Sequence, residues 1–119
     1  MNLLQFYLLS VCLFILNFTA FSQPGLSSKQ QGVNYLRNGQ YIQALEKLNQ
    51  AIEEEPYLAD LYFFRGYAKY NLDDYIGAER DYTKSIDISP FRADVFVNRA
   101  VVRSQQENYT GAFEDYSKA

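Results

Sequence analysis

The chain has 119 residues, enough for one small domain, and carries 11 basic against 14 acidic side chains. No basic run occurs, so the sequence lacks the positive patch that nucleic-acid binding requires, and we expect no nucleic-acid partner. Histidine is absent and Cys12 is the single cysteine, which removes most hydrolytic and zinc chemistry. We therefore expect no enzyme, no metal site and no cofactor, although a mechanism that uses carboxylates alone stays open.

The N-terminal segment is uncharged from Leu3 to Phe21 and mostly apolar. It ends in Ala20-Phe21-Ser22, the small-x-small pattern after which signal peptidases cut. We predict that residues 1–22 are a signal peptide, cleaved between Ser22 and Gln23, and that the mature chain is periplasmic, envelope-associated or secreted. The segment 3–21 is also just long enough to span a bilayer, so a retained membrane anchor is the alternative.

The rest of the chain repeats with a period of 34 residues. Segments 59–85 and 93–119 are identical at nine of 27 aligned positions, where composition alone predicts about two. The identical pairs are Ala59/Ala93, Asp60/Asp94, Arg65/Arg99, Tyr75/Tyr109, Gly77/Gly111, Ala78/Ala112, Asp81/Asp115, Tyr82/Tyr116 and Lys84/Lys118. A weaker copy precedes them, with Gly32, Tyr41 and Ala44 in phase. A period of this length is typical of solenoids built from helix pairs.

Within one repeat the pattern predicts two antiparallel helices. Residues 59–72 have apolar side chains at helical spacing, Asp73-Asp74 form a turn, and a second helix runs from Tyr75 until Pro90 stops it. Small residues, such as Gly66 facing Ala78, let the two helix axes approach closely. We expect Leu48, Tyr82 and Tyr116 to fill the space beside these small pairs. The predicted fold is all-α: an alpha-solenoid of repeats 25–58, 59–92 and a truncated 93–119.

The spacing Gly66…Tyr75…Ala78…Tyr82…Ser85…Pro90 resembles the tetratricopeptide repeat, and the resemblance covers Gly25 to Ala119. Two departures from the family pattern occur. Its frequent tryptophan is replaced by Ser28, Tyr62 and Phe96, and its leucine before the glycine by Gln31, Arg65 and Arg99. Because Asp81 and Asp115 follow the two arginines by 16 residues, we predict Arg–Asp ion pairs between the helices of repeats two and three. Such a pair is worth at most about 1 kcal/mol if it is exposed.

The resemblance implies that the first helices line a concave face that binds a peptide or protein. The residues it places there are Lys29, Val33, Leu36, Arg37, Asp60, Phe63, Tyr67, Tyr70, Asn71, Asp94, Val97, Val101, Ser104 and Gln105. The alternative is that a further helix of the same polypeptide fills this face. Some relatives clamp the C-terminal carboxylate of chaperones. Here Lys29 alone keeps a clamp residue type, Val33, Phe64, Asp94 and Asn98 stand at the other positions, and we expect no such clamp.

The third repeat stops at Ala119, inside its second helix and before a polar capping helix. The leading interpretation is an exported scaffold for protein–protein interaction. The alternative is the regulatory or structural N-terminal part of a longer exported multidomain protein, whose activity lies beyond residue 119. In either case we expect membrane contact only through an uncleaved N-terminal segment.

Overall fold

The structure of the chain, a computed structural model, describes residues 2–10 and 25–119. Residues 3–10 are helical and exposed. The predicted cleavage site between Ser22 and Gln23 lies outside the described residues. Among those that are described, no helix combines the length and the apolar character needed to cross a membrane. The signal peptide and the alternative anchor therefore stay predictions.

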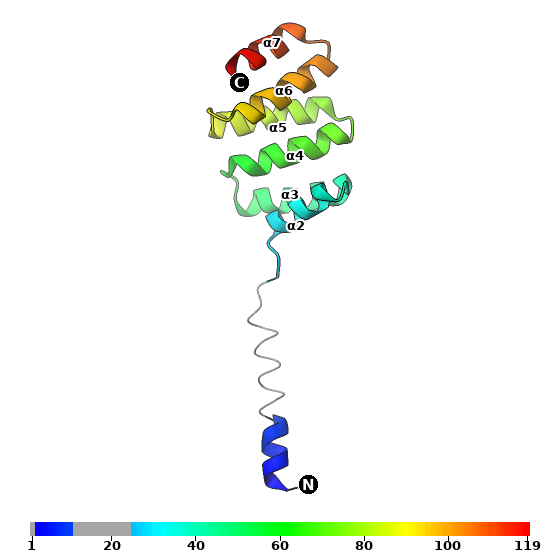
Figure 1. Cartoon of the computed structure of the whole chain (residues 1–119), viewed down its shortest axis with the longest axis vertical. Coiled ribbons are helices and arrows are strands. Elements are labelled where there is room, and N and C mark those ends of the chain that lie inside the picture. The colour runs from blue at the N-terminus through cyan, green and yellow to red at the C-terminus, as the bar shows by residue number, and fades with distance from the viewer. Residues whose placement is uncertain (1, 11–24) are drawn as a thin grey trace.

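The repeats form a stack of antiparallel helix pairs, and the described residues contain no strand (Figure 1). The helices are α2 (Ser28–Arg37), α3 (Tyr41–Glu54), α4 (Ala59–Asn71), α5 (Tyr75–Ile88), α6 (Ala93–Gln105) and α7 (Tyr109–Lys118). Each helix packs against the next one along the chain. The predicted all-α solenoid is thereby confirmed.

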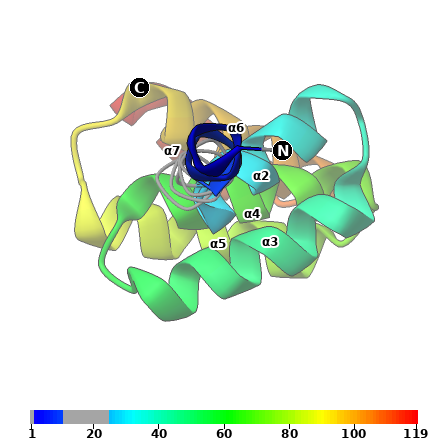
Figure 2. The same ribbon diagram turned by 90° about the horizontal axis from the view of Figure 1, so that it is seen from below.

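The first helices of the repeats share one side of the stack. Helix α4 contacts both α2 and α6, whereas α3 and α5, or α5 and α7, make no direct contact. Viewed along the stack, α2 and α6 lie towards one side and α3 and α5 towards the other (Figure 2). Because the first helices of neighbouring repeats touch each other and the second helices do not, α2, α4 and α6 lie on the inner side of the stack, where the resemblance places the concave face.

Local residue choice determines where the helices end. Helix α4 ends at Asn71, one residue before the predicted boundary, because Leu72 already caps the helix and Asp73 has a φ of 62°. Asp is one of the few residues that adopts this left-handed conformation readily. Helix α5 ends at Ile88, and Ser89 is extended before Pro90, as expected for a residue that precedes proline.

Close packing at the small residues follows the prediction in two repeats. A Cβ built on Gly66 would lie 2.8 Å from the ring of Tyr82, which is fully buried. A Cβ on Gly32 would lie 2.9 Å from the side chain of Leu48, also fully buried. For Tyr116 the prediction is wrong, because this ring is 49% exposed. Repeat three has an alanine, Ala100, in place of the glycine. The methyl group of Ala100 stands where Gly66 has no side chain, so the space that the ring of Tyr82 uses in repeat two is smaller in repeat three.

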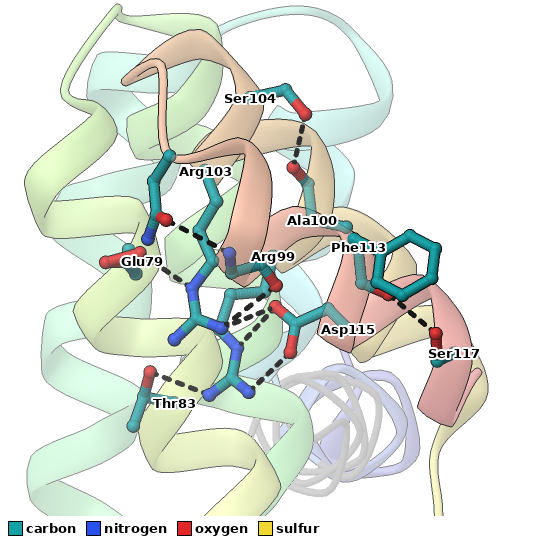
Figure 3. Close-up of polar contacts among 11 residues, drawn as sticks. Glu79, Thr83, Arg99, Ala100, Arg103, Ser104, Phe113, Asp115 and Ser117 are labelled. Carbon is teal, nitrogen blue, oxygen red and sulfur yellow. Dashed lines mark hydrogen bonds and ion pairs between the residues drawn. The ribbon is translucent and has the colours of Figure 1, made fainter.

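Ion pairs join the two helices of repeats two and three, as predicted. Arg65 donates to both carboxylate oxygens of Asp81, at 2.9 Å from Nε and 2.8 Å from Nη2. Arg99 holds Asp115 in the same way, at 2.9 and 2.7 Å (Figure 3). Both contacts are bidentate, which is the strongest geometry for an Arg–carboxylate pair.

The carboxylates of both ion pairs are buried, so the upper limit given above for an exposed pair does not apply. The side chain of Asp81 is 4% exposed and that of Asp115 is fully buried. A second cation also contacts each carboxylate: Lys69 lies 2.9 Å from Asp81, and Arg103 lies 3.0 Å from Asp115 (Figure 3). A carboxylate buried this deeply needs several donors to replace its lost water.

The arginines also connect successive repeats. Nη1 of Arg65 donates to Asn49 on α3, and Nη1 of Arg99 donates to Thr83 on α5, both at 3.1 Å. Asn49 and Thr83 are themselves 34 residues apart, so the third contact of each arginine repeats as well. Each guanidinium therefore bridges three consecutive helices.

Candidate functional site

The concave face contains two neighbouring cavities between α2 and α4. The larger, of about 690 Å³, is lined by Val33, Leu36, Arg37, Asn38, Gly39, Tyr41, Phe63, Phe64, Tyr67 and Asn98. The smaller, of about 420 Å³, is lined by Leu26, Lys29, Gln30, Val33, Asn34, Arg37 and Phe64. Both cavities share Val33, Arg37 and Phe64. Because they share this lining, we treat the two cavities together and call them the α2–α4 groove.

Aromatic rings form much of the wall of the α2–α4 groove. Phe63 and Phe64 lie with ring centroids 5.7 Å apart, and Tyr67 meets Tyr41 edge to face at 6.4 Å. Phe63 also packs against the buried ring of Tyr82, at 5.9 Å. Phe63 is thus held by the core, while Tyr67 is 39% exposed and available to a ligand.

The structure separates the predicted concave-face residues into two groups. The first group lines the α2–α4 groove and comprises Lys29, Val33, Leu36, Arg37, Phe63 and Tyr67. The second group lines neither cavity and comprises Asp60, Tyr70, Asn71, Asp94, Val97, Val101, Ser104 and Gln105. The groove therefore involves the first two repeats, and repeat three contributes Asn98.

Several polar residues of the second group have partners within their own helix. Asn71 donates from Nδ2 to the carbonyl of Tyr67 at 2.8 Å, and Ser104 donates from Oγ to the carbonyl of Ala100 at 3.0 Å. Tyr70 instead packs its ring against that of Tyr75, 5.8 Å away. Such side chains are partly committed before any partner arrives.

Arg92 neutralises the two aspartates of the concave face. Its guanidinium donates to Asp94 at 3.2 and 2.7 Å and also contacts Asp60, while it lies 5.1 Å above the ring of Phe63. The hydrogen bond from Arg92 lowers the pKa of the Asp94 carboxyl, and the same bond raises the pKa of Arg92. The charge of Asp94 is therefore already paired within the chain.

Eight residues that line the α2–α4 groove were absent from the predicted concave-face set: Leu26, Gln30, Asn34, Asn38, Gly39, Tyr41, Phe64 and Asn98. Phe64 and Asn98 stand at positions considered only for a carboxylate clamp. Tyr41 starts the second helix of repeat one, where the resemblance places no ligand contact, although its recurrence at Tyr75 and Tyr109 is visible in the sequence. Within the described residues, no group of three Asp, Glu, Cys or His side chains could hold a metal ion.

The helix pairs recur at the period seen in the sequence, and residues 59–92, which contain α4 and α5, match the tetratricopeptide repeat family. Residues 59–92 form a tetratricopeptide repeat, and the stacked helix pairs share the fold of tetratricopeptide-repeat domains. No curated protein matches its sequence closely enough to count as a relative.

Solved structures of tetratricopeptide-repeat domains share the fold. The second such domain of Spaghetti (RPAP3), bound to the HSP90 peptide SRMEEVD, is 25% identical, with a TM-score of 0.75 over 77% of this chain and 85% of that one. The Arabidopsis OM64 domain is 24% identical, with a TM-score of 0.74 over 76% of this chain and 74% of that one. MamA from Desulfovibrio magneticus RS-1 is 21% identical, with a TM-score of 0.74 over 76% of this chain and 51% of that one. The last two likenesses show the fold alone.

Proposed function

We propose that this protein is a non-catalytic, exported scaffold that binds a peptide or protein segment on its concave face. One observation carries the binding role: the α2–α4 groove combines two cavities with a floor of apolar and aromatic side chains. Concave sites with apolar walls and a few polar groups at the edge are the usual form of a ligand site. The similar domain of Spaghetti (RPAP3), with its bound HSP90 peptide, supports a peptide as the ligand class.

Tyr67 is the residue best placed to test this binding role. It lines the larger cavity, is 39% exposed, and makes no hydrogen bond through its side chain among the described residues. Removing its ring therefore removes ligand contact with little cost to the core. Exposed aromatic side chains at the centre of a site commonly contribute more than tenfold to affinity. Phe63 is a poorer choice, since it also supports Tyr82.

The test pans random peptides displayed on phage against the immobilised full chain and measures the affinity of each enriched peptide. We expect enriched sequences whose binding weakens at least about tenfold in Tyr67→Ala. The matched control is Ile76→Ala, which removes an apolar side chain that is 68% exposed on α5 and outside the groove. Enrichment of nothing, or equal binding to both variants, would overturn the proposed role.

Export is the second part of the proposal and depends on the uncharged segment from Leu3 to Phe21. The intact mass of the protein from its native source tests it. We expect a chain that begins at Gln23. A chain that retains Met1 and fractionates with membranes would favour the anchor, and one that retains Met1 in the soluble cytoplasmic fraction would rule out export.

A further inference from the structure

Two cations without a carboxylate partner flank the apolar part of the α2–α4 groove. Lys29 lines the smaller cavity and Arg37 lines both. The ion pairs among the described residues include neither of them, although Arg65, Arg92, Arg99, Arg103 and Lys69 all have carboxylate partners. The positive charges of Lys29 and Arg37 are therefore free to meet a ligand at the groove.

The sequence positions of these cations determine how far apart they lie. Lys29 and Arg37 are eight residues apart on one helix, which places them on the same face and about 12 Å apart along the axis. Val33 lies midway between them along the helix, and Val33 and Phe64 of α4 both line both cavities. The groove thus presents a charge, an apolar centre and a second charge of the same sign along α2.

An extended peptide matches this spacing. Its residues advance about 3.3 Å each and alternate between two sides, so residues i, i+2 and i+4 share one side over about 13 Å. An acidic residue at i, an apolar residue at i+2 and an acidic residue at i+4 would place two carboxylates near Lys29 and Arg37. The apolar side chain would then enter the depression between Val33 and Phe64.

We propose that the α2–α4 groove recognises an extended internal segment of the form acid–x–apolar–x–acid. This inference depends on the proposed function, since it names the partner that the concave face binds. Side-chain carboxylates supply both negative charges, so no free C-terminus is required. The specificity comes from the two charges, because an apolar floor by itself accepts many sequences.

Fluorescence anisotropy with the full chain tests this inference. The probe is a labelled, C-terminally amidated peptide that contains Glu-Ala-Phe-Ala-Glu, and the comparison peptides contain Lys-Ala-Phe-Ala-Lys, Glu-Ala-Ser-Ala-Glu and the shortened Glu-Phe-Glu. We expect measurable binding of the probe alone, weakening with added salt. Equal binding of the lysine peptide, or of the shortened peptide, would overturn the proposal.

Charge reversal in the protein provides the second readout. We expect Lys29→Glu and Arg37→Glu each to weaken binding of the probe about tenfold. The matched control is Arg80→Glu, which changes the net charge by the same amount. Arg80 is an exposed residue of α5 and, like Lys29 and Arg37, belongs to none of the ion pairs of the described residues. Equal weakening by Arg80→Glu would show a general charge effect and overturn the assignment.

The two proposals fail in different ways. If the phage experiment yields peptides that need Tyr67 but contain no acidic residues, the scaffold role stands and the acidic motif is wrong. If neither the phage library nor the acidic probe binds, both proposals are wrong. Circular dichroism of each variant confirms that a lost signal reflects binding rather than unfolding.

Discussion

Asp115 is fully buried at the end of the repeat stack, and Arg99 donates two hydrogen bonds to its carboxylate, at 2.9 and 2.7 Å. Arg99 is itself buried, so both charges depend on each other rather than on water. Arg103 adds a third hydrogen bond to the same carboxylate, at 3.0 Å (Figure 3). This contact ties α7 to α6 through charge, in a repeat whose outer aromatic ring, Tyr116, is half exposed.

Removing the carboxylate of Asp115 should destabilise the chain strongly. In Asp115→Ala the buried guanidinium of Arg99 loses its counter-charge, and we expect the free energy of unfolding to fall by about 3 kcal/mol. Chemical denaturation followed by circular dichroism measures the change. Glu114→Ala, at an exposed neighbouring position outside every ion pair of the described residues, should leave the stability nearly unchanged. A loss below about 1 kcal/mol in Asp115→Ala would contradict the buried character of the pair.

The earlier copy of this pair should show direct energetic coupling. Arg65 and Asp81 make two hydrogen bonds, and the side chain of Asp81 is 4% exposed, so the contact is poorly screened by solvent. In a double-mutant cycle of Arg65→Ala and Asp81→Ala we expect a coupling energy of about 1–2 kcal/mol. The cycle of Arg80→Ala and Asp87→Ala, two exposed residues that the described ion pairs do not include, should give none. Additive losses for the first pair would refute the prediction.

A methyl group at Gly66 should be costly. The added Cβ would lie 2.8 Å from the ring of Tyr82 and 3.3 Å from the carbonyl oxygen of Ala78, and both neighbours are fully buried. Overpacking of this kind costs about 1–3 kcal/mol, partly offset by about 1 kcal/mol of helix propensity that alanine gains over glycine. We expect Gly66→Ala to lower the melting temperature. Gly25→Ala, where a Cβ meets nothing within 4 Å, should not.

The side-chain caps of α5 and α7 require a glycine three residues later. Asp74 Oδ1 accepts a hydrogen bond from the backbone N–H of Gly77 at 2.9 Å, and a Cβ on Gly77 would overlap that carboxylate. Repeat three has the same arrangement in Asn108 and Gly111. We expect Gly77→Ala and Asp74→Ala each to lose about 1 kcal/mol of stability.

Because both substitutions remove the same capping bond, the double variant Asp74→Ala/Gly77→Ala should lose less than the sum of the two single losses. Thermal denaturation of the three variants provides the comparison. Full additivity would show that glycine serves a purpose other than the cap.

Asp94 should titrate at a lower pH than an ordinary aspartate. The hydrogen bond from Arg92 stabilises its charged form and lowers its pKa in the folded chain. Its small contribution to stability is therefore present above the pKa of the unfolded chain and is lost as the pH falls through the folded value. A carboxyl NMR titration measures this midpoint. Arg92→Ala should move it upwards, whereas Arg80→Ala should not, and an unchanged midpoint in Arg92→Ala would contradict the assignment.

Part of the residue set predicted for the concave face lies at the candidate site. Val33, Arg37 and Tyr67 line the α2–α4 groove, because their positions on the first helices repeat in register with the fold. Val97 and Val101 were grouped with them by the same rule, yet they line neither cavity. A positional rule treats the three repeats as equal. The depth of the face at each repeat depends on the size of its side chains and on how each helix pair tilts against the next.

The sequence by itself determined the helix pairs, their 34-residue period and the pairing of Arg65 with Asp81. These features follow from local residue choice and from spacing, which recur in each repeat and need no knowledge of the third dimension. Only the tertiary structure decided that Asp81 and Asp115 are buried, that Arg92 neutralises Asp94, and which side chains converge on one groove. Burial and convergence depend on the distances between helices of different repeats, and these are set by packing across the whole stack.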